Sequence, residues 1–476
     1  MTRLLCSVFV LAFVASAHSA ERPNVIIILA DDLGYADIGP FGSTKARTPH
    51  LDRMAREGMR LTSHYAAPVC SPCRAALMTG CYPKRSLPIP HVLFPVSEVG
   101  LHPDEVTIAE VMKGADYATA CIGKWHLGDQ PEFLPTRQGF DSYFGLPYSN
   151  DMGTAADGSK SNPGQPIPMP KRPAANRAAQ PMNDEYGLRG NAQPPLPLLE
   201  NEKVIERVRI AEQATLTKRY SEKARAFIRE HRGDPFFLYL PHTAVHFPHY
   251  PAEGARGRSG NGLLNDWIEE LDDTVGELFA ELREQSLEEK TIVFFTSDNG
   301  GSIPHGSINT PLRGTKGQTF EGGIRTPMIA WGPGRIPAGT SSDEVTAMMD
   351  LLPTVASLTG AQPPTDRTLD GRDISPILLG REGARSPHET FYYFRGLALE
   401  AVRSGPWKLH LKSGELYHLG QDIGERENVA ASHPDETARL RTLAARMEGD
   451  LGLDGRGPGC RALGRHPNPQ PLIPAD

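Results

Sequence analysis

The stretch Asn24-Val25-Ile26-Ile27-Ile28-Leu29 runs directly into Ala30-Asp31-Asp32. An unbroken run of apolar, mostly β-branched residues is typical of a strand buried on both faces of a parallel sheet. In open parallel sheets, ligands bind beyond the carboxyl ends of the strands. The stretch therefore predicts an α/β fold, and it marks the two aspartates as candidate ligands of a bound group.

Four further apolar runs alternate with helical patterns along the chain. The predicted strands are Ala118–Ile122, Phe236–Leu240, Ile292–Thr296 and Met328–Trp331. Gly262–Leu287 has apolar residues at steps of three and four, the spacing of one helix face. A second helix is expected from near Pro72 to Gly80, because proline suits the first turn of a helix and glycine its C-terminal cap. The alternation predicts a mainly parallel sheet sandwiched by helices.

Composition divides the chain into a leader, a large domain and a smaller one. Residues 1–20 have the pattern of a secretory signal peptide: an early positive charge, an apolar run and then small residues. The large domain is assigned to 21–385, with a proline-rich segment at about 162–198 interpreted as a surface insertion. Residues 386–476 predict a smaller α+β domain, with short antiparallel strands at Phe391–Phe394, Ala398–Val402, Trp407–Leu411 and Glu415–His418 and a helix at Asp435–Leu451.

Charge and hydropathy limit the partners that this chain can have. The 476 residues carry a formal net charge of −7, which argues against a general nucleic-acid surface. No segment after the leader approaches the roughly 20 apolar residues of a membrane span. We therefore expect an exported protein, periplasmic or secreted, without stable membrane insertion. Of six cysteines, Cys6 lies in the leader, and the remaining five cannot all pair with one another.

Polar side chains follow four of the predicted strands where each strand ends. The oxygen donors among them favour a hard cation, Ca²⁺ or Mg²⁺. Asp and Asn are also ordinary turn formers, so spacing alone leaves a metal site and simple turns as alternatives. The candidate oxygen ligands are Asp31, Asp32, Asp298 and Asn299; the candidate cations and imidazoles are Lys124, His126, Lys316 and His242, with His246 and His249 just beyond it.

The segment Cys70-Ser71-Pro72-Cys73-Arg74-Ala75-Ala76-Leu77-Met78-Thr79-Gly80 admits three interpretations. The first is a buried structural cysteine at the start of a helix. The second is a redox pair, because C-x-P-C at a helix N-terminus lowers a thiol pKa, although this leaves the charged strand ends unexplained. A zinc site is excluded, since no second C-x-x-C follows.

The third interpretation is a resemblance to a family. Cys70-x-Pro72-x-Arg74 followed by Ala-Ala-Leu-Met-Thr-Gly resembles the signature of the sulfatases, in which the cysteine is converted to formylglycine (3-oxoalanine). The chain is similar to the arylsulfatase A branch in particular. Further stretches resemble other parts of the family pattern in the same order: 23–34, 123–128, 145–151, 195–199, 297–300, the loop around Lys316, and 415–428. The resemblance implies an alkaline-phosphatase-like fold, a sulfatase catalytic domain over 21–385 and a C-terminal antiparallel-sheet subdomain.

The resemblance also implies a reaction, the hydrolysis of sulfate esters. One hydroxyl of the hydrated aldehyde at position 70 attacks sulfur and forms a covalent sulfo-enzyme, and the second hydroxyl then expels sulfate. A serine could form the sulfate ester, but it has no second hydroxyl to expel the sulfate. The implied partners are a sulfated small molecule or glycan and a maturation enzyme that generates formylglycine.

By the same resemblance, each matching residue receives a role. Asp31, Asp32, Asp298 and Asn299 hold Ca²⁺ together with an oxygen of modified Cys70; Arg74 orients the diol; Lys124, Lys316 and Ser149 bind sulfate; His126 takes the second proton; and His242, with Lys316, protonates the leaving oxygen. Of the three histidines after the Phe236–Leu240 strand, His242 is chosen because it follows the strand most closely. Position 73 is a cysteine, and a disulfide between Cys70 and Cys73 would compete with the modification.

Two competing functions stay open at the level of the sequence. A phosphatase or phosphonate monoester hydrolase of the same superfamily would share the fold, the metal and the cations. An exported thiol–disulfide exchange protein would use Cys70 and Cys73 but would not need the charged strand ends. The natural substrate is expected to be a sulfated carbohydrate, with aryl sulfates as artificial substrates.

Overall fold

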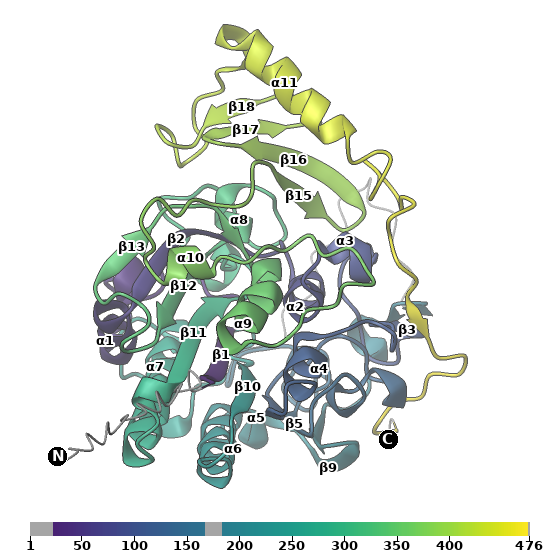
Figure 1. Cartoon of the computed structure of the whole chain (residues 1–476). Helices are drawn as coiled ribbons and strands as arrows, with labels where there is room; N and C mark the ends of the chain where they lie inside the picture. Colours follow the sequence, from purple (N-terminus) through teal and green to yellow (C-terminus); the bar gives the residue numbers. More distant parts are fainter. Residues whose placement is uncertain (1–21, 167–182, 475–476) are drawn as a thin grey trace, which may run out of the picture.

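The computed structural model describes residues 22–166 and 183–474, so the predicted leader lies outside the described residues. An eleven-stranded sheet forms the centre of the large domain, with the strand order β13-β2-β12-β11-β1-β10-β4-β5-β8-β9 and β14 beside β2 (Figure 1). Its strands are β1 (Asn24–Ala30), β2 (Met59–Tyr65), β4 (Ala118–Ile122), β5 (Ser142–Gly145), β8 (Pro197–Glu200), β9 (Lys203–Arg207), β10 (Phe236–Pro241), β11 (Thr291–Ser297), β12 (Arg325–Trp331), β13 (Thr340–Ser342) and β14 (Thr346–Ala347). The predicted α/β class is confirmed.

The sheet is parallel at its centre and mixed toward its edges. β11, β1, β10, β4 and β5 run parallel to one another, while β12 pairs with β11 in the antiparallel sense. Two consecutive strands can be parallel only if the segment between them crosses from the carboxyl edge of the sheet back to its amino edge. The segment 298–324 has only short helical turns and stays at the carboxyl edge, so β12 must run back. The strand predicted at Met328–Trp331 is therefore present, but it is not part of the parallel core.

Helices cover both faces of the sheet, as predicted. The helices are α1 (Pro49–Glu57), α2 (Cys70–Thr79), α4 (Ile108–Lys113), α6 (Leu216–Glu230), α7 (Leu263–Glu284) and α9 (Leu351–Thr359), with shorter α3 (Pro83–Ser86), α5 (Ile210–Gln213), α8 (Glu321–Ile324) and α10 (Ser375–Leu378). Ile26 and Ile28 pack with α1, α6 and α7. Val25, Ile27 and Leu29 pack with α2, α4 and α9 on the other face. Successive side chains of a strand point to opposite faces, which explains why β1 is apolar throughout.

The helix α2 begins at Cys70, two residues before the predicted start at Pro72, and every residue in it is buried. It ends at Thr79 and is capped by Gly80, whose φ of +66° lies in the left-handed region that favours glycine. The predicted C-terminal cap is therefore present. The first residue of this helix faces the carboxyl edge of the sheet.

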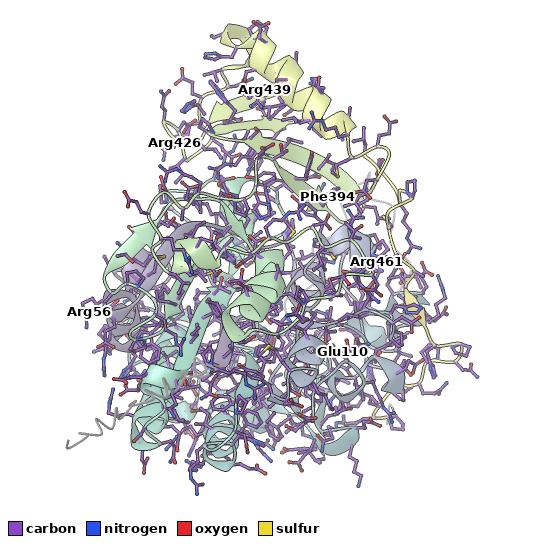
Figure 2. The ribbon with its side chains drawn as sticks, viewed as in Figure 1. Arg56, Glu110, Phe394, Arg426, Arg439 and Arg461 are labelled. Atoms are coloured by element: carbon purple, nitrogen blue, oxygen red, sulfur yellow. The ribbon has the colours of Figure 1, made fainter. Side chains whose placement is uncertain are left out.

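A separate four-stranded antiparallel sheet follows in the C-terminal part, in agreement with the prediction. It contains β15 (Phe391–Arg395), β16 (Ala398–Ser404), β17 (Trp407–His410) and β18 (Leu416–His418), with α11 (Pro434–Ala445) against it. The predicted helix 435–451 is thus shorter at its end. Figure 2 shows Phe394 where this sheet meets the large domain and Arg439 on the outer helix. The ring of Phe394 lies 5.4 Å from the ring of Tyr82.

The proline-rich segment 162–198, interpreted as a surface insertion, is in part built into the large domain. Its residues 167–182 lie outside the described residues. The short strands β6 (Asn183–Asp184) and β7 (Gly187–Leu188) pair with each other, whereas β8 begins at Pro197 within the large sheet. Leu196 and Leu198 are buried in the core, so the last residues of the segment belong to the fold.

The end of the chain returns to the large domain. After α11 it runs along that domain, where β19 (Gly464–Arg465) pairs with β3 (Val99–Gly100). Within the described residues, every helix is too short or too polar to cross a membrane.

Candidate active site

The ends of β1 and β11 bring the predicted oxygen donors together. The two strands are parallel neighbours with Ala30 opposite Ser297, so the residues that follow them meet at one edge. The backbone N–H of Asp32 donates to Asp298 Oδ1 at 3.3 Å. All four predicted oxygen donors are buried: Asp31, Asp32, Asp298 and Asn299.

Each carboxylate of this group has one close cationic partner. Lys124 Nζ lies 2.5 Å from Asp31 Oδ2, and Lys316 Nζ lies 2.6 Å from Asp32 Oδ1. The Arg74 guanidinium donates to Asp298 Oδ2 through Nε at 3.1 Å and Nη2 at 2.8 Å. Arg74 thus orients a carboxylate of the cluster, and it approaches the end of β1 less closely, with Nη2 3.7 Å from Asp31 Oδ2.

The electrostatics of the group follow from burial and from these pairs. Burial works against ionisation of Asp31, but Lys124 and the other cations nearby outweigh it and hold the pKa of this carboxyl far below its usual range. Burial and the neighbouring Asp31 carboxylate raise the pKa of Asp298. Three acidic and three basic side chains balance one another, so a divalent cation would leave the site with excess positive charge. Such a site suits an anion.

Cys70 lies at the first position of α2, beside both charged pairs. Its Sγ is 3.5 Å from Asp31 Oδ1 and 3.6 Å from Lys316 Nζ. Burial raises the pKa of the Cys70 thiol far above its ordinary value, although Lys124 and Lys316 act in the opposite direction. Burial also raises the pKa of Cys73.

A redox pair needs an accessible thiolate of lowered pKa, so the thiol–disulfide interpretation loses its support. All five cysteines in the described residues are free: Cys70, Cys73, Cys81, Cys121 and Cys460. The competing disulfide between Cys70 and Cys73 is therefore not formed.

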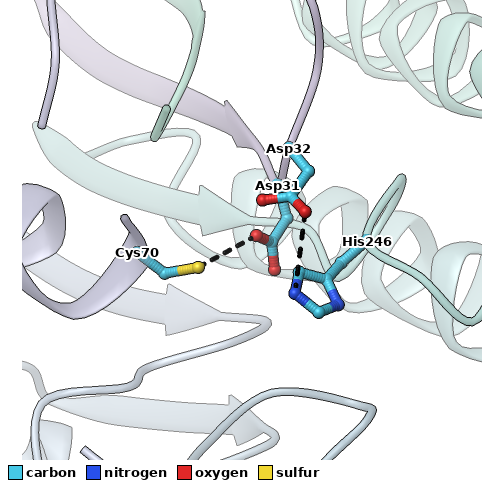
Figure 3. A group of neighbouring side chains, drawn as sticks. All are labelled: Asp31, Asp32, Cys70 and His246. Atoms are coloured by element: carbon cyan, nitrogen blue, oxygen red, sulfur yellow. Dashed lines mark hydrogen bonds and ion pairs between the residues drawn. The ribbon is translucent and has the colours of Figure 1, made fainter. Parts of the chain in front are cut away.

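The structure places His246, and not His242, at the cluster. His246 Nε2 lies 3.7 Å from Asp32 Oδ2, and ligand atoms of Asp31, Asp32, Cys70 and His246 all lie within 4.8 Å of one another (Figure 3). The ring of His242 instead packs against Tyr220 at 6.0 Å, and among the described residues neither of its nitrogens has a hydrogen-bond partner. Nearness to the strand end was the wrong criterion, because the first side chain of the loop points into the protein beside α6.

His126 is fixed in one tautomer by its surroundings. Its Nε2 lies 2.9 Å from the carbonyl oxygen of Leu93, which can only accept, so Nε2 carries the proton. Nδ1 is buried and has no partner among the described residues, and it keeps a free lone pair. Burial and the positive charge of Lys124 hold the pKa of His126 well below its usual range. In this tautomer, a neutral imidazole can accept a proton at Nδ1.

Ser149 lies between Lys124 and His246. Its Oγ lies 3.2 Å from Lys124 Nζ and 3.4 Å from His246 Nδ1. The residue follows β5, whose neighbour β4 leads into Lys124. Its hydroxyl can therefore bind the same anion as the lysine.

The residues at the two strand ends fit a hard divalent cation. Asn299 Nδ2 donates to Asp32 Oδ1 at 2.8 Å, while its Oδ1 is buried without a partner among the described residues. A buried carbonyl oxygen without a donor is costly, and a cation would satisfy it. Carboxylate and amide oxygens are the ligands that Ca²⁺ prefers.

The sequence has relatives among known proteins. A family model described as Sulfatase matches residues 23–361. Arylsulfatase A of Bos taurus is 40% identical over 414 residues, which cover 84% of this chain and 77% of the relative. N-acetylgalactosamine-6-sulfatase of Canis lupus familiaris is 37% identical over 439 residues, 88% of this chain and 78% of the relative.

A solved structure gives the same result for the fold. The crystal structure of Ps i-CgsB in complex with k-i-k-neocarrahexaose has a TM-score of 0.74 and 29% identity, and the match covers 92% of this chain and 94% of that one. The fold, the matching family model and the shared identity lead to one conclusion: the chain belongs to the sulfatase family, whose members hydrolyse sulfuric esters.

Proposed function

We propose that this protein hydrolyses the sulfate ester of a carbohydrate, with Cys70 converted to formylglycine and with Ca²⁺ held at the ends of β1 and β11. The observation that carries the proposal is the position of Cys70, whose Sγ lies between Asp31 Oδ1 and Lys316 Nζ. A sulfate ester is a poor electrophile surrounded by negative charge. It requires a strong oxygen nucleophile together with cations that neutralise that charge.

The modified residue and the metal each supply one part of the chemistry. A hydrated aldehyde at position 70 supplies an oxygen nucleophile, and a divalent cation polarises the sulfate when bound. Asp31, Asp32, Asp298 and Asn299 are the residues that would hold this cation. We prefer Ca²⁺ to Mg²⁺, because the ligands belong to the protein and Mg²⁺ is reluctant to give up its water.

The remaining side chains bind the anion and move protons. Lys124, Lys316 and Ser149 bind the sulfate oxygens, since the two lysines lie against neighbouring carboxylates and the hydroxyl of Ser149 lies beside Lys124. His126 accepts the second proton of the hydrated aldehyde at Nδ1, the nitrogen left free by the bond to Leu93, as sulfate is expelled. His246 takes the role that was expected of His242 and donates a proton to the leaving oxygen, with Lys316 beside it.

A matched pair of variants tests the two histidines. His246→Phe is expected to lower kcat for phenyl sulfate about a hundredfold, in the range of a lost general acid. The loss should be smaller for p-nitrophenyl sulfate, whose leaving group needs less protonation. His242→Phe keeps the ring against Tyr220 and should leave both rates within about twofold. Steady-state rates of the two substrates measure this, and a larger loss for His242→Phe would reverse the assignment.

A structural relative supports a sulfated carbohydrate as the substrate class. Ps i-CgsB was crystallised in complex with k-i-k-neocarrahexaose, an oligosaccharide, which supports a sulfated sugar as the substrate here. The predicted leader supports export to the periplasm or outside the cell, with a formylglycine-generating enzyme as the maturation partner. The alternative is a phosphatase or phosphonate monoester hydrolase with the same cations.

The decisive experiment compares sulfates with phosphates. We expect p-nitrophenyl sulfate to be hydrolysed with a kcat/KM at least about a hundredfold above that of p-nitrophenyl phosphate, and a panel of sulfated mono- and oligosaccharides to show the natural preference. Peptide mass spectrometry of protein expressed with a maturation enzyme should find an aldehyde at position 70. Unmodified Cys70 in fully active protein, or a preference for the phosphate, would refute the proposal.

A further inference from the structure

The segment that carries Lys316 contributes no side chain to the hydrophobic cores that the described residues form on the two faces of the large sheet. We call residues 313–321 the lysine loop. Most of its side chains are exposed or half-buried, and Thr319 and Glu321 are the buried ones. On the side of the large domain, the loop is held by backbone bonds: Lys316 N–H to Gly301 O at 3.2 Å and Gly317 N–H to Pro68 O at 2.8 Å. Apart from the ring of Phe320, which lies 4.6 Å from the ring of His410, the loop is therefore positioned mainly by polar contacts.

The C-terminal sheet supplies further polar contacts. Lys408 Nζ, from β17, donates to Thr319 O at 2.8 Å and to Glu321 Oε1 at 2.9 Å. The hydroxyl of Thr319 donates to Glu400 Oε2 at 2.7 Å. At the other end of the loop, Arg313 Nη1 donates to the hydroxyl oxygen of Tyr417 in β18 at 3.1 Å and to Glu425 O, beyond that strand, at 2.7 Å. The loop is thus joined to the C-terminal sheet at both of its ends.

Lys408 is the centre of this group of contacts. It is fully buried, and its Nζ lies 2.9 Å from both Glu321 and Glu425. The second oxygen of Glu425 accepts from the backbone N–H of Glu321 at 2.7 Å. Burial works against ionisation of Glu321, but Lys408 and Arg325 outweigh it and hold its pKa below the usual range. Buried ion pairs add little stability over apolar residues of the same size, but they fix geometry strictly.

We propose that Lys408 is a positioning residue for anion binding: it holds the lysine loop so that Lys316 Nζ stays against Asp32 and Cys70. The loop has four residues between Lys316 and Glu321, and both ends of this short connection are fixed. The C-terminal sheet thereby contributes to the active site without touching it. The inference rests on the proposed function only in taking sulfate as the anion that Lys316 binds.

The test replaces Lys408 by methionine, which removes the charge and keeps the length. Titration calorimetry with inorganic sulfate as the probe should show a Kd about tenfold higher in Lys408→Met. Hydrogen exchange should become faster in residues 313–321 and should stay unchanged in β1. KM for p-nitrophenyl sulfate should rise more than kcat falls, because a binding contact is loosened.

Lys84→Met is the matched control. Lys84 is also a buried lysine that anchors the C-terminal part, with its Nζ 2.7 Å from Gly452 O, but it has no contact with the lysine loop among the described residues. The control should leave sulfate affinity within about twofold. If Lys408→Met does not fold, Thr319→Val removes the bond to Glu400 and provides a milder version of the same test.

A double variant distinguishes positioning from general stability. In a Lys316→Ala background, Lys408→Met should add less than about a twofold loss of sulfate affinity, since the residue through which it acts is absent. Equal losses in both backgrounds, or unchanged affinity and unchanged exchange in Lys408→Met, would overturn the inference. Failure of the wild type to hydrolyse sulfate esters would refute the proposed function instead, because calorimetry and exchange need no turnover.

Discussion

Cys70→Ala is expected to lower kcat/KM for p-nitrophenyl sulfate by about a thousandfold or more, because it removes the nucleophile and leaves only binding and charge stabilisation. Cys70→Ser should be as inactive in turnover, since a serine ester of sulfate has no second hydroxyl to expel it. The measurement is steady-state turnover of the folded variants, with folding checked by thermal denaturation.

Cys73→Ala is the matched control for this prediction. Cys73 lies on the same buried helix three residues later, and the substitution removes the same atom. This variant should keep activity within a few-fold and lose about 1–2 kcal/mol of stability from the small cavity. A Cys73→Ala variant as inactive as Cys70→Ala would restore the thiol-pair interpretation and refute the formylglycine one.

Removal of the divalent cation should abolish activity without unfolding the protein. A chelator is expected to lower turnover of p-nitrophenyl sulfate by more than about a hundredfold, and added Ca²⁺ should restore it. The fold should survive, because Lys124, Lys316 and Arg74 already neutralise the three carboxylates. Circular dichroism and turnover, measured on the same chelated sample, test both parts of this prediction.

The cation-binding group itself is tested by Asn299→Leu, a substitution of similar size that removes the unpartnered Oδ1. This variant should need a higher Ca²⁺ concentration for half-maximal activity. Activity that is insensitive to chelation in wild-type protein would contradict the metal site.

The sequence predicted the framework of the site well, because the framework depends on strand ends. Apolar runs identified β1, β4, β10 and β11, and parallel neighbours must place Asp31 and Asp298 at one edge. The antiparallel direction of β12 could not be predicted from its apolar run. It depends on whether segment 298–324 crosses the sheet, and a chain without a long helix in that segment carries only a weak local signal.

Sequence reasoning failed where side-chain direction in a loop decides the outcome. His242 and His246 are four residues apart, and no local pattern separates them; only the path of the loop turns one toward α6 and the other toward Asp32. The contacts of Lys408 were missed for a different reason. Its partner Glu321 lies 87 positions away, and a single sequence carries no signal for a pair so distant.

The burial of α2 determines when Cys70 can be modified. Cys70 is only 2% exposed, and every residue of its helix is buried. An enzyme that oxidises this thiol has to hold the segment in its own active site, and it cannot do so once α2 has packed against the sheet. The formylglycine proposed here must therefore be made on the nascent or unfolded polypeptide. Protein that has folded with an unmodified thiol would stay inactive, however much maturation enzyme is added later.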